Sequence, residues 1–107
     1  MKMLKEDKSM SIYLSIQFNV KDAEAFQTYS SKVGETVKLY GGETIGVSKA
    51  PQTLVGNPGS EFFVLQQWPS LEAAETWHQS KEYAPLKILR DEQAVSELKI
   101  IVIPGLN

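Results

Sequence analysis

Two residues of this sequence have side chains suited to acid–base or anion-binding chemistry, His78 and Arg90. His78 is the single histidine, and imidazole is the side chain whose ordinary pKa lies nearest neutrality, so His78 is the candidate general base. Arg90 is the single arginine, and its guanidinium can hold a carboxylate or an enolate through two parallel hydrogen bonds. Each residue also has a structural alternative. His78 would then be a satisfied residue at the boundary of the core, and Arg90 would form an ion pair with Glu82, Asp91 or Glu92.

A row of polar side chains on the first predicted strand, Tyr13, Ser15 and Gln17, offers candidate contacts for a small organic ligand. Gln67 on a later strand can join this row on the same face of the sheet. The alternative is that the row forms the moderately polar part of an interface between two copies of the chain.

Residue types and spacing exclude several other chemistries. The chain has no cysteine and one histidine, so it offers no disulfide, no cysteine nucleophile and no cluster of thiolate or imidazole metal ligands. Gly41-Gly42 follows a predicted helix and lacks the spacing of a phosphate-binding loop. Eleven basic and thirteen acidic residues give a net charge of -2, which provides no electrostatic basis for binding nucleic acid or anionic lipid. We therefore expect no metal, no cofactor and neither a nucleic-acid nor a membrane partner.

The length of 107 residues, 42% of them hydrophobic, suits one folded domain. Met1–Met10 carries five charges and no periodic apolar pattern, which is typical of a flexible tail and not of a secretory signal. No stretch has the roughly 18 apolar residues of a membrane span. We expect a tail over residues 1–10, a single domain over residues 11–107 and a cytoplasmic location.

The first half of the domain is predicted from apolar spacing. Strict alternation over Ile12–Phe18 predicts a strand with one buried face. Apolar residues at three- and four-residue steps from Phe26 to Tyr40 predict an amphipathic helix, with Asp22 as its N-cap and Gly41-Gly42 as its end.

The next segment is predicted to form a broken strand, a turn and a full strand. The broken strand covers Thr44–Val47, is interrupted around Pro51 and resumes at Thr53–Val55. Gly56–Gly59 is dense in turn formers, and Phe62–Trp68 is a strand that is apolar on both faces.

The last segment is predicted to form a helix in two pieces and a final strand. Ser70 is the expected cap of a helix over Leu71–Gln79, and Pro85 fits only the first turn of a second helix that ends near Val95. Glu82 lies in the break at Ser80–Tyr83, where its carboxylate is expected to cap a helix, or alternatively to face a cleft. The final strand is expected over Leu98–Ile103.

The order β-α-β-β-α-β predicts the α+β, ferredoxin-like fold, a four-stranded antiparallel sheet with the helices on one face. Phe63 and Leu65 then point away from the face that holds Phe62 and Val64, so the helices cannot cover every apolar side chain. Soluble monomers seldom expose such a patch, and a homodimer packed sheet to sheet would remove it. The alternative is that a loop or the N-terminal tail covers this face.

Several segments show a resemblance to a known family: Tyr40-Gly41-Gly42, Leu54-Val55-Gly56, Phe63-Val64-Leu65, Trp68–Ala74, Trp77–Tyr83 and Leu89-Arg90. Over about residues 11–105 the chain resembles the family named "domain of unknown function 1330", of the dimeric α+β barrel group, most specifically from Pro69 to Arg90. It departs from the family pattern at Glu43, Lys49-Ala50, Val55, His78 and Lys81, where a basic residue, a glycine pair, an acidic residue, a tyrosine and a proline are usual.

The resemblance implies a homodimer with a small-ligand cleft between sheet and helices, and no established activity. In related barrels such clefts lie within one subunit, which makes Tyr40, Tyr83 and His78 candidate lining residues. By analogy with other dimeric barrels, the alternative is a cofactor-independent enzyme, monooxygenase- or isomerase-like, acting on a small carbonyl or aromatic compound. His78 would be its base, and Arg90 would stabilise the developing negative charge. A closed pocket that holds these two side chains together would favour the enzyme.

Overall fold

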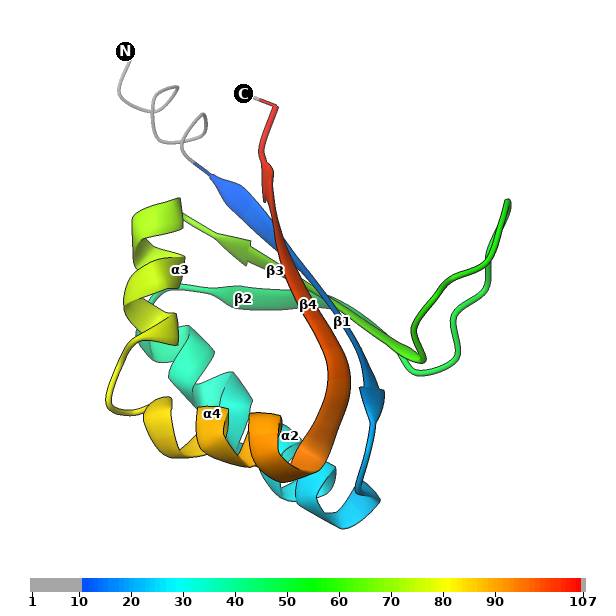
Figure 1. Cartoon of the computed structure of the whole chain (residues 1–107). Coiled ribbons are helices and arrows are strands. Elements are labelled where there is room, and N and C mark those ends of the chain that lie inside the picture. The colour runs from blue at the N-terminus through cyan, green and yellow to red at the C-terminus, as the bar shows by residue number, and fades with distance from the viewer. Residues whose placement is uncertain (1–10, 107) are drawn as a thin grey trace.

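A computed structural model describes residues 11–106, which form a four-stranded antiparallel sheet with the helices on one face (Figure 1). The strands are β1 (Ile12–Val20), β2 (Glu43–Ser48), β3 (Phe62–Trp68) and β4 (Val95–Pro104), in the order β2-β3-β1-β4. The helices are α2 (Ala23–Leu39), α3 (Leu71–His78) and α4 (Ala84–Leu89), and a π-helical turn, η1 (Arg90–Ala94), continues α4. The predicted ferredoxin-like order is confirmed, including the broken second helix. The predicted tail over residues 1–10 lies outside the described residues.

Strand β1 lies inside the sheet and supplies the floor of the core. Its alternate residues Ile12, Leu14, Ile16 and Phe18 are all buried, as their spacing predicts. β1 pairs antiparallel with β3 on one side and with β4 on the other, and its buried row packs beneath the helices.

Helix α2 begins and ends where the sequence predicts. The Asp22 carboxylate accepts hydrogen bonds from the backbone N–H groups of Glu24 at 3.0 Å and Ala25 at 3.3 Å, which satisfies donors that have no partner inside the helix. After the helix, Gly41 has φ of +95°, a conformation that L side chains rarely adopt. At Gly42 a Cβ would lie 2.6 Å from the indole of Trp68, so this position has no room for a side chain.

The predicted continuation of the second strand at Thr53–Val55 is wrong. β2 ends at Ser48, and residues 49–61 form a loop that projects from the sheet (Figure 1). Leu54 and Val55 are fully exposed in it. The β-branched residues there are too few to form a ladder after Pro51, which has no N–H to donate.

The break between α3 and α4 lies where the sequence predicts, but Glu82 does not cap α4. The N-terminus of α4 has no side-chain cap. The Ser80 hydroxyl oxygen instead accepts from the backbone N–H of Tyr83 at 3.2 Å within the break. In α3 the predicted cap is confirmed, because Ser70 Oγ accepts from the N–H of Ala73 at 3.1 Å.

Strand β4 begins at Val95, three residues before the predicted start at Leu98. A bulge explains the difference. Glu97 has φ of +56°, and the pairing of β1 with β4 shifts register between Gln17 and Asn19. Such an irregularity breaks the alternation by which a strand is recognised in a sequence.

Two tryptophans tie α3 to the rest of the domain. Trp68 and Trp77 are each 1% exposed, and their ring centroids are 5.3 Å apart. Trp68 Nε1 donates to Gln66 Oε1 and Trp77 Nε1 donates to Thr36 Oγ1, both at 2.9 Å. These contacts fix α3 against β3 and against α2.

The sheet face opposite the helices, here called the open face, carries both polar and apolar side chains. Strand pairing places these residues side by side on it: Tyr13, Ser15, Gln17, Phe63, Leu65, Gln67, Lys99, Ile101 and Ile103. Leu65, Ile101 and Ile103 are 38%, 44% and 45% exposed. The uncovered apolar row predicted from β3 is therefore present, and β4 extends it.

Candidate functional site

Arg90, the first residue of η1, is 7% exposed and lies at the centre of a partly buried polar cluster. Its Nε and Nη2 donate to the two carboxylate oxygens of Asp91 at 2.7 and 3.0 Å. Its Nη1 donates to the Tyr83 hydroxyl at 3.2 Å and lies 3.2 Å from Nε2 of His78. The guanidinium thus joins residues from α3, from the break that follows it and from η1.

The contact with Arg90 determines the hydrogen-bonding state of His78. A guanidinium donates and cannot accept, so Nε2 of His78 must accept with its lone pair. Burial lowers the pKa of His78, and the positive charges of Lys87 and Arg90 lower it further. The imidazole is therefore neutral at pH 7, with its hydrogen on Nδ1.

Two tyrosines extend the cluster into the core. The hydroxyl of Tyr83 shares a 2.5 Å hydrogen bond with that of Tyr29 on α2. The Tyr83 ring packs on Trp77, with centroids 4.3 Å apart. Burial raises the pKa of Tyr83 and raises that of Tyr29 well above its ordinary value, so both phenols remain protonated. A continuous chain of polar contacts runs from Tyr29 through Tyr83 and Arg90 to His78.

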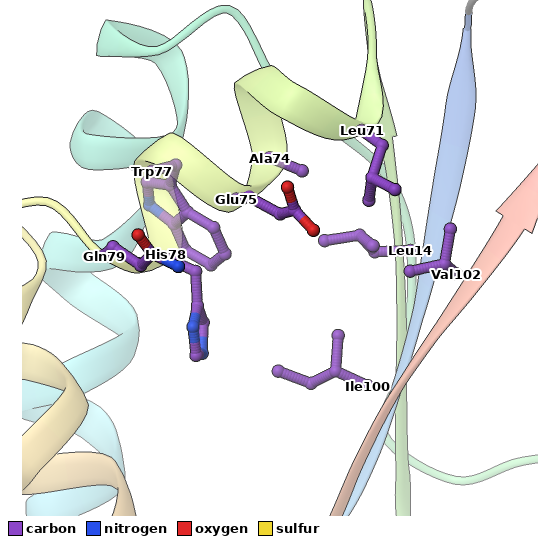
Figure 2. Close-up of a pocket in the computed structure, with 9 residues that line it drawn as sticks. All are labelled: Leu14, Leu71, Ala74, Glu75, Trp77, His78, Gln79, Ile100 and Val102. Atoms are coloured by element: carbon purple, nitrogen blue, oxygen red, sulfur yellow. The ribbon is translucent and has the colours of Figure 1, made fainter.

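His78 also lies at the edge of a cleft of about 260 Å³ between α3 and strands β1 and β4, here called the α3 cleft. In Figure 2 the side chains of α3 face Leu14, Ile100 and Val102 across an open space. The lining from α3 and its end is Leu71, Ala74, Glu75, Trp77, His78 and Gln79. The walls are mostly apolar, and the polar groups are few, as in small-molecule sites.

The structure brings together three of the predicted site residues and separates the others. His78, Arg90 and Tyr83 are in contact. Tyr13, Gln17 and Gln67 lie on the open face, on the side of the sheet away from these three.

Tyr40 lies at the C-terminal end of α2, where its hydroxyl donates to Glu82 Oε1 at 2.7 Å. This bond raises the pKa of Tyr40 and lowers that of Glu82. Glu82 is therefore not the partner of Arg90, and the ion pair considered for Arg90 is made by Asp91.

Two members of the site were missed by sequence reasoning. Tyr29 was assigned only to the apolar stripe of its helix, and nothing local signals its contact with Tyr83, 54 residues away. Glu75 was not singled out, although it precedes His78 by three residues on the same helix. Side chains at that spacing lie on one face, so the spacing could have placed Glu75 beside the cleft.

Within residues 11–106, no three histidine, aspartate or glutamate side chains converge as metal ligands would. None of the helices in the same range combines the length and apolar character needed to cross a bilayer.

Comparison with solved structures shows the same fold in other proteins. A protein of unknown function from Rhodopseudomonas palustris is 16% identical, with a TM-score of 0.76, over 97% of this chain and 88% of that chain. SnoaB, a cofactor-independent oxygenase from Streptomyces nogalater, is 10% identical, with a TM-score of 0.61, over 91% and 94%. A dimeric protein of unknown function and ferredoxin-like fold from Bacteroides fragilis is 12% identical, with a TM-score of 0.56, over 89% and 96%. At these identities the likeness shows the fold alone.

No curated protein matches the sequence. The family model described as "Domain of unknown function (DUF1330)" does match, over residues 11–106. That match includes all of the described residues. The protein therefore belongs to the DUF1330 family.

Proposed function

We propose that this protein binds a small, neutral, largely apolar molecule with a carbonyl oxygen in the α3 cleft, and that it does so as a homodimer. The observation that carries the proposal is the state of His78: a neutral imidazole at the edge of an apolar cleft, with Nε2 held by Arg90. The remaining hydrogen-bonding group of the ring is the Nδ1 hydrogen, which suits an acceptor oxygen on the ligand.

The charges around the α3 cleft favour a neutral ligand over an anion. The positive charge of Arg90 is matched by the carboxylate of Asp91, which it holds through two hydrogen bonds. The acidic side chain of Glu75 lines the cleft itself. An anion would therefore be repelled by the Glu75 carboxylate and would meet no cationic side chain among the lining residues. A neutral ketone avoids the larger cost of removing a charge from water.

The homodimer is proposed to form through the open face. Leu65, Ile101 and Ile103 lie there without cover from residues 11–106. A second copy packed on the same face by a two-fold axis would bury them. The Bacteroides fragilis neighbour is described as dimeric. The cytoplasmic location expected from the sequence stays a prediction.

The binding proposal can be tested with 1-indanone, a bicyclic ketone. We expect amide resonances of α3 to shift in a two-dimensional NMR titration. Val102→Phe, which fills the α3 cleft from β4, should weaken binding at least about tenfold, or 1.4 kcal/mol. Val47→Phe is the matched control, because Val47 is also an exposed strand residue but does not line this cleft. Equal affinities of the two variants, or no binding by the parent protein, would contradict the proposal.

A second candidate function is a cofactor-independent enzyme of the monooxygenase or isomerase type, acting on a small carbonyl or aromatic compound. The observation that favours it is the contact of His78 with Arg90. Base catalysis needs the Nε2 lone pair, so the substrate carbonyl oxygen must first draw Nη1 of Arg90 away from it. Nε2 would then take a proton from the carbon next to the carbonyl, and Arg90 would stabilise the enolate.

Hydrogen–deuterium exchange tests the proton transfer separately from binding. In D₂O, the C2 protons of 1-indanone should exchange faster with the protein than without it, because His78 would remove a proton and return a deuteron. His78→Gln, which can still accept from Arg90, should abolish the acceleration. If the C2 protons exchange at the same rate with and without the protein, the enzyme candidate is contradicted and the binding proposal is unaffected.

A further inference from the structure

A second cleft lies between α2 and strands β1, β2 and β3, toward the β2 edge of the sheet, whereas the α3 cleft lies toward the β4 edge. Its volume is about 320 Å³, and we call it the α2 cleft. Neither His78 nor Arg90 lines it. It therefore needs an explanation separate from the α3 cleft.

Three phenylalanines form one aromatic wall of the α2 cleft. Phe18 and Phe62 are stacked with centroids 5.3 Å apart, and Phe26 lies 5.5 Å from Phe18 and 5.2 Å from Phe62. Phe26 and Phe62 are only half-buried, because α2 does not close fully over β3. A flat aromatic ligand could pack against this wall in the offset or tilted geometries that aromatic rings prefer.

A buried amide supplies a hydrogen-bond donor to this cleft. Gln66 is 4% exposed and lines the α2 cleft. Its Oε1 accepts from Trp68 Nε1, and since an indole only donates, this contact identifies the oxygen and the nitrogen of the amide. Nε2 of Gln66 makes no hydrogen bond to residues 11–106, and it is not fully enclosed, because Ser60 Oγ is the one fully buried polar side-chain atom of this range that lacks a partner. Nε2 is therefore accessible and can donate to an acceptor atom of a ligand in the cleft.

The opposite end of the α2 cleft carries a positive charge. Lys49 is its one charged lining residue within the described range, and no carboxylate of residues 11–106 forms an ion pair with it. Ser48 pairs with Phe63, three residues before Gln66 on β3. Lys49 lies one residue beyond this pair, so its backbone position is about four residue steps from Gln66, or about 13 Å along the strand direction at about 3.3 Å per residue.

From this arrangement we propose that the α2 cleft binds an aromatic carboxylic acid of two fused rings, with a second oxygen at the far end. The rings pack against Phe18, Phe26 and Phe62. The carboxylate lies at Lys49, and the second oxygen accepts from Nε2 of Gln66. The ligand differs in charge from the one proposed for the α3 cleft, so the two sites select different molecules.

The test uses 6-hydroxy-2-naphthoate and its methyl ester, which lacks the negative charge. We expect the acid to bind once per chain and to shift amide resonances of α2 and β2. Val47→Phe narrows the α2 cleft and should reduce affinity at least about tenfold, while Val102→Phe, which fills the α3 cleft, should leave it unchanged. This pattern is the reverse of that expected for 1-indanone, so the two proposals can fail independently.

Charge recognition is tested by Lys49→Gln. This change should weaken binding of the acid by about fivefold, or about 1 kcal/mol, and leave the methyl ester unaffected. Lys38→Gln, on α2 but outside the lining, is the matched control for the loss of a positive charge. The proposal is overturned if the acid does not bind at about 1 mM, if its shifts map to α3, or if Val47→Phe binds it as the parent protein does.

Discussion

Arg90 donates a hydrogen bond to the lone pair of His78, because Nη1 of the guanidinium lies 3.2 Å from Nε2 of the imidazole. The two residues regarded as a base and an anion-binding group are therefore in contact, and each limits the other. While the contact lasts, His78 is a hydrogen-bond donor through Nδ1 and not a base. A substrate that converts it into a base must first compete for the guanidinium.

The state of His78 predicts a pH dependence of stability. Because the pKa of His78 is lowered in the folded protein, the unfolded chain binds a proton more readily than the folded chain below its ordinary pKa of about 6.5. The contribution of His78 to the free energy of unfolding is therefore fully present above that pH and is lost as the pH falls through the pKa of the folded state. Urea denaturation between about pH 7 and pH 5 should show the decline, and His78→Gln should reduce its slope. An unchanged slope would contradict the assignment.

The planar shape of the Arg90 guanidinium should contribute more to the free energy of unfolding than its positive charge does. Arg90→Lys keeps the charge, but a lysine ammonium cannot reproduce the planar fork that contacts Asp91, Tyr83 and His78 together. We expect the free energy of unfolding to fall by about 1–3 kcal/mol. Asp91→Asn should cost less, because the Asp91 side chain is 51% exposed and water can replace it. Equal losses in the two variants would show that the ion pair, and not the buried fork, stabilises the cluster.

The open face is expected to form the dimer interface. Leu65→Glu would bury an unpaired carboxylate in that interface at a cost of several kcal/mol, so the variant should sediment as a monomer at micromolar concentration. Ile88→Glu, at an exposed position on α4, is the control and should remain dimeric. A 12.0 kDa species for the parent chain would contradict the proposed dimer.

Two glycines should respond to alanine in opposite directions. Gly34 lies within α2, and a Cβ there meets nothing within 4 Å, so Gly34→Ala should stabilise the protein by about 0.5–1 kcal/mol. At Gly42 a Cβ would lie 2.6 Å from the Trp68 indole. Gly42→Ala should therefore destabilise it by about 1–3 kcal/mol through overpacking. Urea unfolding monitored by tryptophan fluorescence measures both changes, and a stabilised Gly42→Ala would disprove the close packing.

Local patterns predict most of the fold. The alternation in β1, the end of α2 at Gly41-Gly42 and the broken helix all depend on neighbouring residues, and all are confirmed. Thr53–Val55 was misassigned because β-branched residues form a strand only when a neighbouring strand is available to pair with them. The start of β4 was not predicted, because the bulge at Glu97 interrupts the apolar alternation by which a strand is recognised in a sequence.

The candidate site was predictable by residue type and less so by position. His78 and Arg90 are each the sole member of their type, which was enough to single them out, and the structure places them together. Their connection through Tyr83 to Tyr29 depends on how α2 packs on the break before α4. Alternation places Tyr13 and Gln17 on one face of β1, but it does not say on which face a ligand would bind. Contacts between distant segments had to be seen in the structure.

The packing of Trp68 against Trp77 gives the molecule an optical signature of its own. Two indoles 5.3 Å apart and inclined by 37° couple their electronic transitions, which should produce a paired positive and negative band in the far-ultraviolet circular dichroism spectrum. One chromophore belongs to the sheet and the other to α3. If this band weakens during mild heating while the secondary structure is retained, α3 has separated from β3 before the rest of the domain unfolds. The measurement needs no attached dye.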